Sequence, residues 1–192
     1  MNNITWEIKD DTLFITGTGA MPDFDEVNGD CAEWIDKDFS TVIIEDGITH
    51  IGRSAFYDCR SLESITIPDS VKSIGTSAFE NCKNLKSVVL PDSVKYIKGF
   101  CFTNCINLKD IVIPNGVKDI GDCAFSRCRS LKQITIPDSV KKIGNYALVG
   151  CGDVVIHTSK GSTAHRYAVD NDINVRIVSS LKKGNKNKGI ER

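Results

Sequence analysis

The sequence predicts a solenoid, in which short parallel strands stack along one axis, and three observations predict it. Five of the eight cysteines follow one another at intervals of 23 residues: Cys59, Cys82, Cys105, Cys128 and Cys151. Proline, glycine and apolar residues recur at the same interval, so the period belongs to a structural unit rather than to one residue type. The 192 residues are 41% hydrophobic, which is enough to bury a core in one repeat array.

Five repeats of 23 residues cover residues 44–158. The second reads IPDSVKSIGTSAFENCKNLKSVV from Ile67, and the fourth reads IPNGVKDIGDCAFSRCRSLKQIT from Ile113. The last begins at Ile136 and loses the pattern after Cys151. One unit of this length cannot bury its own apolar side. Stacked units must therefore share a continuous core, with neighbouring strands about 4.8 Å apart.

Each repeat is expected to begin with a short strand that has one buried face. Ile65 and Ile67 alternate with Thr66, which is a period of two. Pro68 ends the strand because proline has no N–H to donate to a sheet. In four repeats a glycine follows the second apolar pair, as at Gly75, and we expect it to supply a backbone shape that other residues avoid. The Ala-Phe pair that comes next is expected in a short helical turn, after which a cysteine and a leucine lead to the next strand.

Residues 1–43 are predicted to form an N-terminal cap, because a bare terminal coil would expose its core to water. Alternating apolar residues over 4–16, with Asp10 and Asp11 at the turn, predict a β-hairpin. The acidic, less regular segment that follows is expected to be anchored on the first coil by Trp34, Ile35 and Phe39.

Residues 159–180 are predicted to form a C-terminal cap made of a helix and then a strand. Ser162 is placed to cap the start of the helix. From 181 to 192 the chain is rich in Lys, Gly and Asn with almost nothing apolar, so we expect a disordered basic tail. The helix is expected to present one apolar face made of Ala164, Tyr167, Ala168 and Val169.

The pattern I-P-x-x-V-x-x-I-G-x-x-A-F-x-x-C-x-x-L-x-x-I resembles the BspA-type leucine-rich repeats of bacterial and protist proteins. It covers about residues 41–158, and the flanking TWEIKDDTLFITGTGAM and GSTAHRYAVDNDI are similar to that family's N-terminal cap and closing helix. The general leucine-rich pattern has an asparagine where this chain has Ser93, a departure expected of the subtype. The resemblance implies a right-handed, horseshoe-like leucine-rich repeat solenoid used for adhesion or partner binding, often at a cell surface. It brings no enzymatic activity.

Composition and the opening residues bear on partners and location. Lys+Arg 24 against Asp+Glu 25 gives a formal net charge of −1, so we do not expect nucleic acid as a partner. No apolar run approaches the roughly 20 residues of a membrane-spanning helix, so membrane insertion is not expected. The opening MNNITWEIKDD has no basic start followed by an apolar stretch, so no secretory signal is predicted. The location therefore stays open between the surface that the resemblance implies and the cytoplasm.

The repeated cysteines are predicted to be a column of small buried thiols rather than a disulfide framework or a metal site. Five side chains in one column cannot all pair, and parallel side-chain directions suit a disulfide poorly. No C-x-x-C is present, so zinc has no starting motif. Cys101 and Cys123 are interpreted as local packing variants, and Cys31 as the most reactive thiol. A thiol-based redox enzyme is the remaining alternative, and it requires a cysteine that reacts in the native state.

No catalytic, cofactor or metal site is predicted, and the chain is not expected to be an enzyme. The G-x-G of residues 17–22 meets Pro22 where a dinucleotide loop has its third glycine, so it is interpreted as a turn. A calcium loop around Gly29 would place Phe24 at a ligand position, so the acidic segment is interpreted as a solvated loop. The three histidines lie in different segments, and none has a serine or cysteine beside it in a recognisable motif.

Two charge patterns follow the repeat. A column of lysines stands three residues after a column of aspartates, and the two are expected to neutralise each other. A second, basic set flanks the start of each strand, with Glu63 alone to compensate it, and faces either an acidic partner or only solvent. The first pattern contains Lys72, Lys95, Lys118 and Lys141 with Asp69, Asp92 and Asp138; the basic set contains Arg60, Lys83, Lys86, Lys109, Arg129 and Lys132.

The outward side of the strands is the predicted surface for a protein or glycan partner. A continuous row of exposed aliphatic side chains on a flat sheet would form a contact patch. A second patch, Tyr96 and Phe100, is expected on another side of the coil. The alternative function is a structural spacer or self-associating scaffold with no ligand of its own. The predicted partner-binding residues are Ile43, Thr66, Val89, Val112 and Thr135, flanked by Ser64, Ser87, Asp110 and Gln133, with Val155 continuing the first row.

Overall fold

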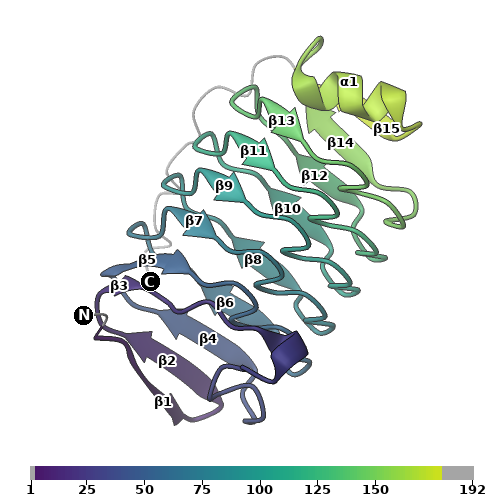
Figure 1. Ribbon diagram of the computed structural model, residues 1–192. Coiled ribbons are helices and arrows are strands. Elements are labelled where there is room, and N and C mark those ends of the chain that lie inside the picture. The colour runs from purple at the N-terminus through teal and green to yellow at the C-terminus, as the bar shows by residue number, and fades with distance from the viewer. Residues whose placement is uncertain (1–2, 179–192) are drawn as a thin grey trace, which may run out of the picture.

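The computed structural model describes residues 3–178, which form the predicted solenoid (Figure 1). Along one side runs a ladder of short parallel strands, and one antiparallel strand precedes it. Regular strand pairing in the ladder lapses only between the strand at Ser87–Val89 and the strand at Asp110–Val112. There the amide N of Lys109 lies 3.5 Å from the carbonyl O of Lys86. The ladder strands are β1 (Thr5–Lys9, antiparallel), β2 (Thr12–Thr16), β4 (Thr41–Ile44), β6 (Ser64–Thr66), β8 (Ser87–Val89), β10 (Asp110–Val112), β12 (Gln133–Thr135), β14 (Val155–Thr158) and β15 (Asn174–Ile177).

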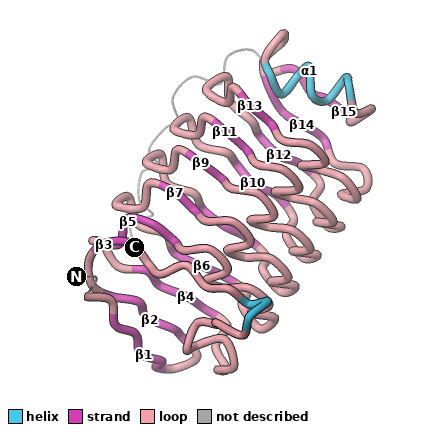
Figure 2. Tube along the Cα trace, in the orientation of Figure 1, coloured by secondary structure: helices cyan, strands magenta, loops and turns pink. Residues whose placement is uncertain are grey.

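A second parallel sheet forms another side of each coil, and sequence reasoning did not predict its strands. Most of them have two residues, which is too short for a period of two to show in the sequence. Loops and turns make up most of the remaining chain in each coil (Figure 2). The strands are β3 (Gly19–Ala20), β5 (Ile48–Ile51), β7 (Ser73–Ile74), β9 (Tyr96–Ile97), β11 (Asp119–Ile120) and β13 (Lys142–Ile143).

The third side of each coil, here called the turn column, is the Ala-Phe segment of each repeat. The expected helical turns are present as single turns, closed by bonds such as Cys82 N–H to the carbonyl of Phe79 at 3.2 Å. They do not lengthen into helices within residues 3–178. Between coils, amides of one turn donate to carbonyls of the next, as Phe79 N does to Cys101 O at 2.8 Å. The turns are thus bonded along the solenoid axis as the strands are.

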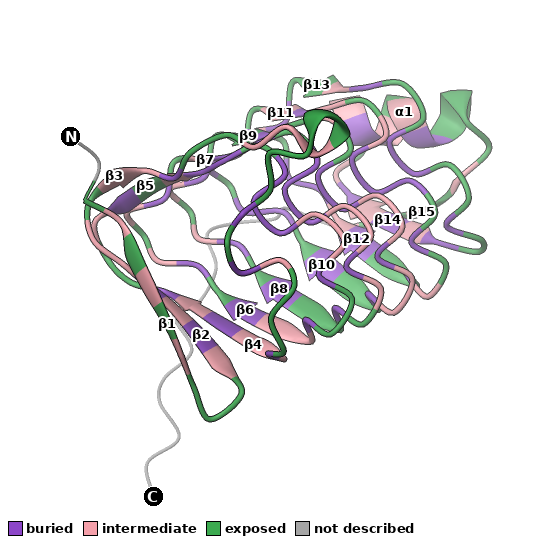
Figure 3. Cartoon of the chain, turned by 60° about the horizontal axis from the view of Figure 1, so that its bottom comes forward, coloured by how far each residue is buried: buried purple, intermediate pink, exposed green. Residues whose placement is uncertain are grey.

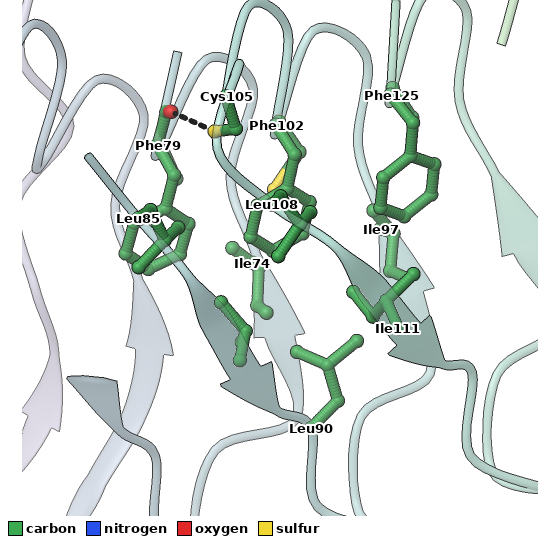
Figure 4. Packing of buried hydrophobic residues seen from close by; sticks show 14 of the residues in the cluster. Ile74, Phe79, Leu85, Leu90, Ile97, Phe102, Cys105, Leu108, Ile111 and Phe125 are labelled. Atoms are coloured by element: carbon green, nitrogen blue, oxygen red, sulfur yellow. Dashed lines mark hydrogen bonds between the residues drawn. The ribbon is translucent and has the colours of Figure 1, made fainter. Parts of the chain in front are cut away.

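The core is built from the same apolar positions in successive coils, and these side chains pack against their equivalents in the next coil (Figure 4). Phe56, Phe79, Phe102 and Phe125 are fully buried and stack face to face, with ring centroids 5.2, 5.2 and 5.3 Å apart. These centroid distances lie in the range that aromatic pairs favour, and they follow from the spacing of the coils. The stack therefore ties the register of one coil to that of its neighbours.

The glycine column owes its composition to space, which corrects the expectation of an unusual backbone shape. Gly75 does not adopt a left-handed φ. A Cβ on Gly75 would lie 2.6 Å from the amide N of Arg53 and 2.7 Å from the carbonyl C of Gly52. At Gly75 the neighbouring coil therefore lies too close for a Cβ to fit unless backbone atoms move. The left-handed positions come two residues later, at Ser54, Ser77 and their equivalents.

The N-terminal cap is confirmed. β1 and β2 form the predicted hairpin, and Asp10 and Asp11 both adopt left-handed φ at its turn, which suits a two-residue connection. Trp34 and Phe39 are buried on the first coil, and the indole N–H of Trp34 donates to Ala55 O at 2.9 Å. The acidic segment contains one short 3-10 helix at Glu26–Asn28.

The C-terminal cap is the predicted helix and strand, α1 (Thr163–Asp170) and β15. The hydroxyl of Ser162 caps α1 by accepting the amide of His165 at 3.0 Å. Ala164 and Ala168 are buried, but Val169 is 61% exposed. The prediction that Val169 belongs to the apolar face of the helix was therefore wrong. The predicted tail at 181–192 lies outside the described residues. Among those residues, α1 is far too short to cross a membrane.

Candidate binding face

The outward side of the ladder, here called the strand face, brings the predicted binding residues together in two rows. Pairing aligns Ile43 with Thr66 and then Val89, and on the next strands Val112 with Thr135. The second row aligns Ser64 with Ser87, and Asp110 with Gln133.

Alternation along each strand decides what the strand face shows. Val88 and Ile111 point inward and are 7% and 2% exposed, whereas their neighbours Val89 and Val112 are 78% and 62% exposed. Figure 3 shows this change from buried to exposed along β8 and β10. Ile43, at the N-terminal end of the row, is only half-buried. The exposed aliphatic surface is therefore centred on the middle of the face.

The first row ends differently from the prediction. Val155 pairs with Gln133 and so belongs to the second row, while His157 pairs with Thr135 and Arg176 pairs with His157. The step from Thr135 to its partner His157 is 22 residues, one fewer than in the other repeats, so Ile156 and Thr158 point inward and Val155 lies in the second row. The C-terminal end of the strand face is consequently polar and basic rather than aliphatic.

The basic set beside the strand face is partly compensated. Lys86 forms an ion pair with Glu63 at 2.5 Å, and Arg60 forms one with Asp58 at 2.9 Å. Lys109 and Lys132, next along the same column, form no ion pair within the described residues. The exposed valines are thus bordered on one flank by lysines without a carboxylate partner.

The lysine and aspartate columns interact otherwise than expected. Lys72 and Lys141 donate to the backbone carbonyls of Asp69 and Asp138, at 3.1 and 2.7 Å, rather than to carboxylates. No ion pair links the two columns within residues 3–178. They place opposite charges near one another without fixing pairs.

The predicted second patch lies away from the strand face. Tyr96 is on β9 and is 41% exposed; Phe100 is in the turn column and is 42% exposed. The ammonium of Lys98 lies 5.0 Å from the centre of the Tyr96 ring, a cation–π contact. Phe100 adopts a left-handed φ of 57°, an uncommon backbone for a bulky residue.

The cysteine column is buried, and its thiols do more than fill space. Cys82, Cys105, Cys128 and Cys151 each donate to the carbonyl of a phenylalanine in the preceding coil, at 3.0–3.2 Å. All eight cysteines are free thiols, and Cys31 is exposed. Burial raises the pKa of the Cys59 thiol to about 12. Sequence reasoning predicted the burial but not the repeated S–H to carbonyl bond.

Two asparagine contacts also escaped sequence reasoning. Asn104 donates to the amide oxygen of Asn81 at 2.8 Å, and Asn107 donates to that of Asn84 at 3.2 Å. They join the second and third repeats at positions other than that of Ser93, whose hydroxyl donates to Val71 O at 2.6 Å. The signal was present as two asparagine pairs spaced by 23 residues.

One histidine lies beside a serine, which the sequence did not reveal. His50 Nδ1 is 2.7 Å from the hydroxyl of Ser73, its neighbour across β5 and β7, and His50 Nε2 is 3.8 Å from a carboxylate oxygen of Asp23. Asp23 also accepts the amide of Arg53 at 2.6 Å. These contacts tie the acidic segment to the second sheet. No group of three or more potential metal ligands occurs within the described residues.

The comparisons with known proteins agree with this geometry. The chain is similar to a leucine-rich repeat protein from Eubacterium ventriosum, with 31% identity over 82% of this chain and 42% of that chain, at a TM-score of 0.73. A T. pallidum leucine-rich repeat protein shares 28% identity over 80% of this chain and 68% of that one, at 0.61. For a leucine-rich cell surface protein from Faecalibacterium prausnitzii the values are 25%, 82%, 54% and 0.55.

This chain therefore spans about two fifths of the length of the Eubacterium protein. No curated protein matches it. The family description "BspA type leucine rich repeat region" matches residues 33–154 in six copies, which is more than half of the chain. The chain belongs to the BspA-type leucine-rich repeat family.

Proposed function

We propose that the chain is a non-enzymatic module that binds a protein or glycan partner through the strand face, in adhesion or another partner interaction. One observation carries the proposal: Val89 and Val112 hold large apolar side chains in water, 78% and 62% exposed, at the centre of the strand face, on β8 and β10, the two strands between which regular pairing lapses. Exposed aliphatic surface arranged contiguously is typical of interaction sites. The family supports a binding or scaffold role of this kind.

The surroundings of the two valines suit recognition. Ser87, Asp110 and Gln133 offer donors and acceptors from the adjacent outward row. The ladder fixes their backbones before any partner arrives, so little conformational entropy is lost on binding. A location at the cell surface is part of the proposal. It is supported by the similarity to the Faecalibacterium protein, which is described as a cell surface protein.

The test begins with the chain immobilised and screened against a glycan array and a displayed peptide library. Each ligand found is then measured against Val89→Glu and Val112→Glu, with Val169→Glu as the matched control, because Val169 is 61% exposed on α1. We expect each strand-face variant to weaken binding about 30-fold, as loss of a hot-spot residue does. The control should bind normally, and all variants should keep the wild-type melting temperature. Ligands that bind the strand-face variants and wild type equally would refute the proposal.

The second candidate, a spacer or scaffold that associates with itself, is favoured by the pair Tyr96 and Phe100, each about two fifths exposed. Multi-angle light scattering over a range of concentrations distinguishes it from the first. Oligomers that Tyr96→Ala and Phe100→Ala convert to monomers would support it. A monomer at every concentration would exclude it.

A further inference from the structure

The backbone amides of the turn column donate hydrogen bonds in one direction, from each coil to the next. Phe56 N donates to Ala78 O at 2.8 Å, and the equivalent phenylalanine amides of later coils do the same. The positions two residues before and after also donate, as Cys123 N does to Asn145 O at 2.9 Å and Arg127 N does to Val149 O at 2.7 Å. Every coil thus presents three amide donors toward the C-terminal end.

The last coil has no successor to receive its three donors, which are the amides of Tyr146, Leu148 and Gly150. The C-terminal cap satisfies one, because the hydroxyl of Tyr167 accepts Leu148 N at 3.3 Å. The amides of Tyr146 and Gly150 have no acceptor within residues 3–178. By the repeat, both face the space that a further coil would fill. Both residues are exposed, so their amide donors are left to water and are open to an acceptor from outside.

A cavity of about 310 Å³ lies at this end of the turn column, and Tyr146 and Gly150 both line it. Tyr167 contributes a second phenol ring, and Asp153 and Asp172 contribute two carboxylates. The lining contains no lysine, arginine or histidine. Tyr146 is 65% exposed. It adopts a left-handed φ, which is uncommon for a residue with a large side chain. Amide donors, aromatic rings and carboxylates thus converge on one hollow.

Comparison with the preceding coil shows how the hollow arises. Arg127 and Arg129 are replaced one repeat later by Gly150 and Gly152, and the following position changes from serine to Asp153. Gly150 and Gly152 both have left-handed φ, 76° and 66°. Relative to the preceding coil, two basic side chains are therefore lost and one carboxylate is gained at the open end.

We propose that this cavity binds a basic polypeptide segment of a partner. Backbone carbonyls of the segment accept the amides of Tyr146 and Gly150, and a lysine or arginine side chain lies near Asp153 and Asp172, against the phenol rings. A free anion would accept the amides but would meet two carboxylates. A simple cation would suit the carboxylates but leave the amides unpaired. A peptide with a basic side chain offers both kinds of partner.

The test is an NMR titration of the full chain, following the amide signals of Tyr146 and Gly150. The probe is the blocked peptide acetyl-Gly-Lys-Gly-amide, with acetyl-Gly-Glu-Gly-amide and butylammonium as comparators. We expect saturable shifts at both amides with the lysine peptide, and binding at least about tenfold weaker for each comparator. Equal binding of butylammonium would overturn the backbone contact, and equal binding of the glutamate peptide would overturn the role of the carboxylates.

Two matched variants complete the test. Val149→Lys places a positive charge on the cavity lining, and Val169→Lys places one on α1 outside it; the valines are 49% and 61% exposed. Only the first should abolish the peptide-induced shifts. Shifts that grow with protein concentration alone would place a second copy of the chain in the cavity, and so overturn a foreign segment. The absence of any saturable shift would overturn the proposal altogether.

Discussion

Replacing Gly75 with alanine tests the reason for the glycine column directly. The φ of Gly75 lies outside the left-handed region, so alanine meets no strain in its own backbone. The added Cβ would instead lie 2.6 Å from Arg53 N, 2.7 Å from Gly52 C and 2.9 Å from Gly52 O. These are backbone atoms, which no side-chain rotation can move away. The two coils must separate locally, and the hydrogen bond from Gly75 N to Ile51 O, 2.8 Å, lengthens with them.

The magnitude follows from two opposing effects. Overpacking of a well-packed site costs about 1–3 kcal/mol. The stiffer unfolded chain of an alanine variant offsets roughly 0.4–1 kcal/mol of that cost. The net loss in the free energy of unfolding is thus about 1–2 kcal/mol. A chain of this size loses roughly 2–4 °C of melting temperature per kcal/mol, so Gly75→Ala should melt roughly 2–8 °C below wild type.

Calorimetry and urea titration measure this loss, and Gly99→Ala is the matched control. Gly99 follows Lys98, the residue that replaces glycine in the third repeat. A Cβ on Gly99 would come no closer than 3.2 Å, to Asp122 O. We expect the control to stay within about 0.5 kcal/mol of wild type. If Gly75→Ala is as stable as wild type, or if both variants lose equal stability, close approach of the coils does not explain the glycine column.

Three further predictions concern the core, the thiols and pH. Phe102→Ala removes one stacked ring and should cost about 3–5 kcal/mol in a urea titration, whereas Phe100→Ala should cost less than about 1 kcal/mol; similar losses would argue against the stack. A thiol reagent at neutral pH should modify the exposed Cys31 in the folded protein. It should modify Cys59 only on unfolding, because burial raises the pKa of that thiol to about 12; equal modification rates of the two thiols in the folded protein would contradict this. Burial raises the pKa of the Glu80 carboxyl, so the folded state binds its proton more tightly and stability should rise as pH falls through that pKa. Glu80→Gln should therefore melt above wild type at neutral pH and lose this pH dependence; an unchanged pH profile would exclude Glu80 as its source.

The ladder could be predicted from the sequence because one coil's environment repeats. Once Ile65 and Ile67 are assigned to the core, the spacing of 23 residues assigns Val88 and Leu90 in the same way, and Val89 must point outward. The second sheet could not be predicted, since two-residue strands such as β7 are stabilised by their neighbours rather than by any local pattern.

The alignment of the strand-face residues was predicted correctly where the repeat holds and wrongly where it fails. Val155 was placed in the first row, but the chain reaches the partner of Thr135 after 22 residues rather than 23, and that partner is His157. The contact between His50 and Ser73 was missed for a different reason. Two residues 23 apart are direct neighbours in a solenoid, and a search for motifs along the chain does not examine such pairs.

The direction of the turn-column hydrogen bonds gives the two ends of the array different chemical requirements. Because each coil donates amides forward, the first coil presents carbonyls and the last presents amides. The N-terminal cap supplies donors: Phe24 N to Arg53 O at 3.0 Å and the indole of Trp34 to Ala55 O at 2.9 Å. The C-terminal cap must supply acceptors, and among residues 3–178 the one that it provides in the turn column is the hydroxyl of Tyr167. A further coil, or a peptide with a coil's carbonyl spacing, would meet the rest of that requirement, whereas a copy of the N-terminal cap would not.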